Sequence, residues 1–97
     1  MIAATDSFEL AVSRFNASEA ARTVAGLTRT LGEPHVSIGA AAGSPDAARV
    51  TVAWDLTWYQ WMVAGGEQER PVAELAHGTE LEQLDPAARQ WNAKWRS

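Results

Sequence analysis

Three absences limit what this chain can be. Cysteine is missing altogether, which excludes disulfide bridges, thiolate zinc sites and thiol catalysis. No apolar run approaches the roughly 20 residues that a membrane helix needs, and the N-terminal stretch MIAATDSFELAVSRF lacks the basic start and apolar segment of a secretory signal. We therefore expect a cytoplasmic protein with no membrane partner. Arginine far outnumbers lysine, which occurs only as Lys94, and this bias suggests a GC-rich bacterial genome.

Basic charge is also scarce. The chain has 8 lysines and arginines against 12 aspartates and glutamates, a formal net charge of -4. A nucleic-acid binder needs a basic face that neutralises phosphates. The charge balance therefore argues against a nucleic-acid partner.

Motifs for metal, cofactor or phosphate chemistry are missing as well. His35 and His77 stand far apart, and neither belongs to an HxH or HExxH arrangement that would aim two imidazoles at one metal ion. The glycines of SIGAAAGSP fit neither GxGxxG nor GxxxxGK[ST], and no helix follows that could hold an anion. We expect no metal site, no cofactor and no recognisable catalytic residue.

The length of 97 residues suits one compact domain, and 46% hydrophobic with 21% charged residues is ordinary for a globular chain. In SFELAVSRF, Phe8, Leu10 and Val12 alternate with more polar or smaller residues, and this period of two predicts a half-buried strand over residues 7–15. We expect a single domain over residues 1–97 that begins with a strand.

An amphipathic helix is predicted over residues 17–31. Its apolar stripe recurs at steps of four, three and four, through Ala20, Val24, Leu27 and Leu31. Asn16 and Glu19 resemble a capping box at its start, whereas Gly32 and Pro34 stop it.

The rest of the chain predicts an antiparallel meander and a C-terminal helical region. HVSIGAA (35–41) and ARVTVAWDLTWYQWMV (48–63) flank the turn-forming AGSPDA, and residues 71–76 follow a second turn as a weak edge strand. Thr79 with Glu82 predicts a short helical turn, and Asp85 before Pro86 starts a helix over residues 85–97. One apolar stripe of that helix is formed by Leu84, Ala88, Trp91 and Trp95.

The predicted fold class is therefore α+β: strand, helix and antiparallel meander of three to four strands, with one or two C-terminal helices packed on one sheet face.

The run WDLTWYQWMV (54–63) holds three of the five tryptophans and the single tyrosine. Read as a continuation of the strand from Val50, its even positions are apolar through Trp58, and its odd positions turn apolar at Tyr59, Trp61 and Val63. Either a bulge near residues 58–60 swaps the two faces, or both faces are covered in the second half of the strand.

These alternatives carry different functions. A bulge would turn Trp61 into the core, where aromatics contribute large apolar area. Without it, Tyr59, Trp61 and Val63 would form an exposed partner-binding patch, of the kind that marks interfaces. The second alternative predicts a non-enzymatic interaction or regulatory protein that binds another protein or itself, as a homodimer.

Two further hypotheses use the same run. In a small-molecule binding module, Trp54, Trp58 or Trp61 would line an apolar pocket, with Asp55 or Gln60 as its polar handle. In a small enzyme, Asp55 and His35 would form the site, with burial raising the pKa of the Asp55 carboxyl group. Strand alternation instead predicts that Asp55 points to solvent.

Overall fold

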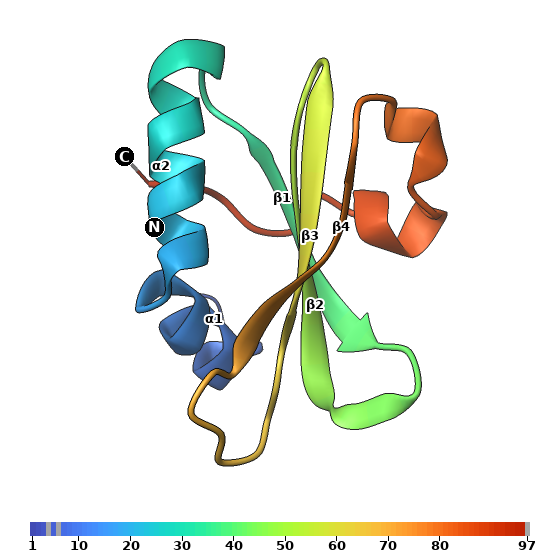
Figure 1. The fold of residues 1–97 in the computed structure, drawn as a ribbon. Helices are drawn as coiled ribbons and strands as arrows, with labels where there is room; N and C mark the ends of the chain where they lie inside the picture. Colours follow the sequence, from blue (N-terminus) through green and yellow to red (C-terminus); the bar gives the residue numbers. More distant parts are fainter. Residues whose placement is uncertain (4, 6, 97) are drawn as a thin grey trace.

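The computed structural model describes residues 1–3, 5 and 7–96, with Pro45 described by its backbone alone. Two helices precede a sheet, and two single turns of 3-10 helix follow it (Figure 1). In chain order the elements are α1 (Glu9–Asn16), α2 (Glu19–Leu31), β1 (His35–Ala41), β2 (Ser44–Trp54), β3 (Thr57–Val63), β4 (Val72–Gly78), η1 (Leu81–Gln83) and η2 (Pro86–Arg89). No helix among these residues is long and apolar enough to cross a membrane.

The four strands form one antiparallel meander in the order β1-β2-β3-β4. Figure 1 shows α1 and α2 on one face of this sheet, here called the helix face, and η1 and η2 on the other, here called the far face. The α+β class predicted from the sequence is confirmed.

The aromatic run is not one strand. Trp54 pairs with Thr57, so Asp55 and Leu56 form a two-residue turn between β2 and β3. Directly opposed residues of antiparallel strands share a face, and Val50 pairs with Trp61 while Val52 pairs with Tyr59. The change of parity that the sequence shows therefore comes from a chain reversal, so the prediction of one long strand and of a bulge as the cause is wrong. The alternative that both faces are covered in the second half is confirmed, because Trp58 and Gln60 are buried on the far face and Trp61 and Val63 on the helix face.

Two other irregularities shape the sheet. The register between β1 and β2 jumps from the Ala40–Ala48 pair to Ala41–Ser44, so the turn contains only Ala42 and Gly43, and residues 45–47 have no partner on β1. In β4, Gln60 pairs with Ala76 but Trp61 pairs with Glu74, which makes Leu75 an extra residue. The predicted edge strand over 71–76 is formed, with slightly later bounds.

The predicted N-terminal strand is wrong, because residues 9–16 form α1. Its buried residues are Ala11, Val12 and Phe15, a helical spacing, whereas Leu10 is 53% exposed. Glu, Leu and Ala are strong helix formers, and their preference agrees with packing against α2 and the sheet.

The predicted helix over 17–31 is confirmed as α2, although its start differs. Ser18 is the N-cap residue, and Asn16 does not cap the helix. The amide of Asn16 instead bonds both backbone groups of Ile2, accepting from its N at 2.7 Å and donating to its O at 2.9 Å. Gly32 ends the helix with a φ of 90°, a conformation that favours glycine.

The predicted helix over 85–97 is not formed within residues 85–96, and Ser97 lies outside the described residues. Asp85 caps η2 and Pro86 occupies its first turn, as expected, but η2 ends at Arg89. Trp91 then adopts a φ of 48° and the chain extends along the outer edge of β1, where Ala93 donates to the carbonyl of Val36 at 3.2 Å. Trp95 forms a bridge with Ile2, so the two ends of the chain lie side by side.

Each sheet face has its own apolar cluster. The larger one lies on the helix face and includes Phe15, Val24, Trp54, Trp61 and Trp95. The smaller one lies on the far face and is formed by Ala53, Trp58, Leu84 and Ala88, with Trp91 packed against it. Trp91 and Trp95 therefore serve opposite clusters, which a single helical stripe would not allow.

Candidate functional site

The residues predicted to form an exposed partner-binding patch do not form one. Trp61 is 5% and Val63 is 1% exposed, both in the cluster of the helix face. The rings of Trp61 and Phe15 form a T-shaped pair with a centroid distance of 5.3 Å and an interplanar angle of 71°. The core position that the sequence offered as the alternative is the one observed, and the turn at Asp55 rather than a bulge produces it.

Tyr59 is half-buried and links this core to the surface. Its ring stacks on Trp61 at 5.6 Å and lies 5.8 Å from the ring of His77 on β4. Nδ1 of His77 lies 3.2 Å from a carboxylate oxygen of Glu74, and both side chains are largely exposed. The pair lies outside the lining of the two hollows described below.

The residues proposed as a tryptophan-lined pocket do not converge. Trp54 and Trp58 belong to the clusters of opposite faces. Gln60 is buried on the far face, where its amide donates to the hydroxyl of Thr51 at 3.1 Å. Asp55 is exposed in the β2–β3 turn. These four side chains therefore do not line one pocket, whereas a ligand site beside Trp58 and Gln60 alone, which share the far face, stays a prediction.

His35 and Asp55, the residues proposed as the site of a small enzyme, are not joined in the structure. His35 is exposed at the start of β1 and packs against Trp91 at a centroid distance of 5.5 Å. Within the described residues no hydrogen bond or ion pair joins it to Asp55. The same part of the chain holds no group of three or more side chains suited to a metal ion.

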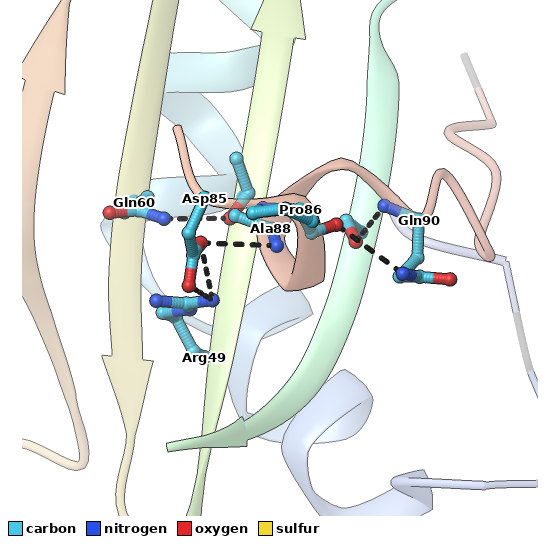
Figure 2. Close-up of polar contacts among 8 residues, drawn as sticks. Arg49, Gln60, Asp85, Pro86, Ala88 and Gln90 are labelled. Carbon is cyan, nitrogen blue, oxygen red and sulfur yellow. Dashed lines mark hydrogen bonds and ion pairs between the residues drawn. The ribbon is translucent and has the colours of Figure 1, made fainter. Parts of the chain in front are cut away.

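Polar contacts on the far face fasten the C-terminal segment to the sheet (Figure 2). Arg49 donates to both carboxylate oxygens of Asp85, at 3.0 and 3.2 Å, while Asp85 also accepts from the backbone N of Ala88 at 3.2 Å. The backbone N of Gln90 donates to the hydroxyl of Ser37 at 3.2 Å. Every one of these groups has a structural partner, so the network positions η2.

An open hollow lies on the helix face, beside the start of α1. We call it the α1 hollow; its volume is about 290 Å³. It is bounded by the start of α1, Ala40 of β1, residues 46–48 of β2 and residues 63–65 at the end of β3. Alanine and glycine predominate in this lining, and their small side chains leave the space unfilled.

The wall of the α1 hollow is held in place from two sides. A Cβ atom on Gly65 would lie 1.9 Å from the carbonyl oxygen of Asp46, so the two backbones touch at a point where only glycine fits. The guanidinium group of Arg14 donates to the carbonyls of Ala64 and Gly66. The loop that follows β3 is thereby fixed against β2 and α1.

Two half-exposed apolar side chains border this hollow. Phe8 is 41% exposed and has φ 59° and ψ 33°, the left-handed conformation, which is an outlier for a bulky residue. It also lines a second hollow of about 280 Å³ with Ser7, Ile38 and Asn92. Leu10 is 53% exposed. Strained residues of this kind cluster at binding sites.

The charged residues in the lining of the α1 hollow are both acidic. Glu9 lies at the start of α1 and Asp46 at the irregular part of β2, and both are exposed. The α1 hollow thus combines an apolar floor with a negative rim.

Elsewhere in the described chain, partial burial lowers the pKa of the Met1 α-ammonium group, which donates to the carbonyl of Arg96.

This hollow was not predicted from the sequence. Alanine, the residue type that predominates in its lining, occurs in turns and helices of every kind and so does not mark a hollow. No protein-family model, no curated protein and no solved structure matches the chain. Function therefore has to be inferred from the surfaces of the molecule.

Proposed function

We propose that this protein is a non-enzymatic interaction protein whose α1 hollow receives an apolar side chain of a partner protein. The observation that carries the proposal is the open hollow of about 290 Å³ bordered by Phe8 and Leu10, which leave 41% and 53% of their surface exposed. Exposed apolar surface around a pocket is typical of protein interfaces, whose binding energy is concentrated in side chains buried in such pockets.

The size and shape of the hollow favour a side chain over a small molecule. Ligand pockets have volumes of about 300–1,000 Å³ and enclose most of their ligand, whereas the α1 hollow is at the lower limit and open to solvent. A small molecule bound there would leave one side in water. A partner protein would cover that side and bury Phe8 and Leu10 as well.

The hollow also exists before binding. Gly65 and Arg14 fix its wall through backbone contacts, so the partner would not have to order this loop. Preformed sites lose less free energy to ordering when they bind.

A neutral analogue of one side chain tests the proposal. N-acetyl-leucine amide is titrated into the ¹⁵N-labelled protein, and amide shifts are followed by NMR. We expect weak, saturable shifts confined to residues around the α1 hollow. Ala40→Leu should abolish them, because Ala40 pairs with buried Ala48 and shares its face.

Ala73→Leu is the matched control. Ala73 is also an exposed alanine in a strand, but it lies on β4 opposite Met62 and outside the lining of the hollow. This variant should bind the probe like the wild type. Shifts spread over the surface, or unaffected by Ala40→Leu, would contradict the proposal.

Self-association remains a separate prediction. The homodimer expected from the sequence relied on an exposed Trp61, which is buried, so a dimer would have to use another surface. Sedimentation equilibrium over a range of concentrations measures it directly.

A further inference from the structure

We infer that the partner segment is basic: a lysine or arginine lies next to the apolar side chain that enters the α1 hollow, and the carboxylates of Glu9 and Asp46 contact it. This inference rests on the proposed function and adds the charge of the partner. Glu9 and Asp46 belong to different elements on the border of one apolar hollow. Complementary charge at an interface steers encounter and selects partners.

Neighbouring cations leave the two carboxylates available. Arg14 lies on α1, and its guanidinium group is bound to the carbonyls of Ala64 and Gly66. Arg49 pairs with Asp85 on the far face. Among the described residues, neither Glu9 nor Asp46 takes part in an ion pair.

The remaining charges near this end of the molecule are mostly acidic. The loop that continues from the wall of the hollow carries Glu67, Glu69 and Arg70, all exposed. The whole chain has a formal net charge of -4, which repels a second copy and attracts a basic partner. The charges therefore favour a different protein over self-association at this site.

Because both carboxylates are exposed, they contribute to selectivity more than to affinity. Exposed ion pairs are weak individually and are screened by salt. Two of them should make a basic segment bind about threefold to tenfold more tightly than a neutral one. The apolar contact would supply the remaining affinity.

Three tripeptide amides with the same central leucine test the inference: acetyl-Lys-Leu-Lys, acetyl-Ser-Leu-Ser and acetyl-Glu-Leu-Glu. Dissociation constants are measured by NMR titration of the wild type at low salt and in about 1 M NaCl, where the Debye length is about 3 Å. We expect the lysine peptide to bind most tightly and the glutamate peptide least tightly. The differences should nearly vanish at high salt.

Neutral isosteres locate the effect. Asp46→Asn and Glu9→Gln should each reduce the preference for the lysine peptide over the serine peptide, and the double variant should abolish it while the serine peptide binds as before. Asp55→Asn removes an exposed carboxylate at the β2–β3 turn, outside the hollow. This control should keep the full preference.

The failures are distinguishable. Equal binding of all three peptides, lost in Ala40→Leu, would overturn the basic partner and keep the hollow. Absence of binding by any peptide would overturn the proposed function itself. A lysine preference that survives the double variant would also overturn the inference, because carboxylates other than Glu9 and Asp46 would then cause it. Self-association abolished by Ala40→Leu would overturn it as well, because the hollow would then bind a second copy of this protein.

Discussion

Trp54 and Trp58 are four positions apart in the chain but lie on opposite faces of the sheet. Nε1 of Trp54 donates to the carbonyl of Gly32 at 2.9 Å, at the end of α2. Nε1 of Trp58 donates to the carbonyl of Glu80 at 2.9 Å, just before η1. Each indole therefore bonds the segment that covers its own face.

Both tryptophans should contribute to stability in the same way. Trp54→Phe and Trp58→Phe each remove a hydrogen bond and part of a buried ring, and we expect each to lower the free energy of unfolding by about 1–3 kcal/mol. Leu56→Ala, between them in the exposed turn, should change it by less than about 0.5 kcal/mol. Urea denaturation measures all three. A neutral Trp58→Phe would show that the hydrogen bond from the Trp58 indole to Glu80 adds nothing to stability.

Trp61→Glu should unfold the protein or cost more than about 3 kcal/mol, because the carboxylate would replace a ring that is 5% exposed against Phe15. Tyr59→Phe, which keeps the stacked ring, is the mild control. Circular dichroism and size-exclusion chromatography distinguish the outcomes. A folded Trp61→Glu variant would contradict the burial of Trp61 in the wild-type protein.

The parts of the fold that have strong local signals could be predicted from the sequence. Gly32 tolerates the positive φ that ends α2, and Pro34 cannot continue a helix; Asp85 accepts a backbone hydrogen bond at the start of η2, where Pro86 fits the first turn. The Asp55–Leu56 turn has no such signal. It contains aspartate but no glycine, and the pairs that normally mark a two-residue hairpin, such as Asn-Gly and Asp-Gly, contain glycine.

Long-range packing decided the remaining elements. The alternation in SFELAVSRF suits a strand, but the segment forms the helix α1, from which Phe15 packs on Trp61. The spacing of Trp91 and Trp95 suits a helix, yet the side chain of Asn92 bonds the backbone N and O of Ile38 at 2.8 and 2.9 Å and holds this segment extended. The α1 hollow had no signal at all, because it results from side chains that are small.

Gly65 and Gly66 should respond oppositely to the same substitution. Gly65→Ala places a Cβ atom 1.9 Å from the carbonyl oxygen of Asp46, whereas a Cβ atom on Gly66 meets nothing within 4 Å. We expect Gly65→Ala to cost about 1–3 kcal/mol and Gly66→Ala to be neutral or slightly stabilising. Thermal unfolding of both variants tests this. Equal stabilities would mean that the loop after β3 does not touch β2.

Phe8 should show a separation of stability from binding. Its left-handed backbone, with φ 59°, costs an ordinary residue about 1–2 kcal/mol and costs glycine very little. Phe8→Ala loses the ring and keeps this cost, whereas Phe8→Gly loses the ring and is released from it. Phe8→Gly should therefore be more stable than Phe8→Ala by about 1 kcal/mol, although alanine is the more stabilising residue at most positions. Both variants should weaken binding of N-acetyl-leucine amide equally, because both lack the aromatic border of the α1 hollow.

Urea denaturation measures the stability of the two variants, and NMR titration measures their binding. An alanine variant as stable as the glycine variant would place Phe8 outside the left-handed region in solution.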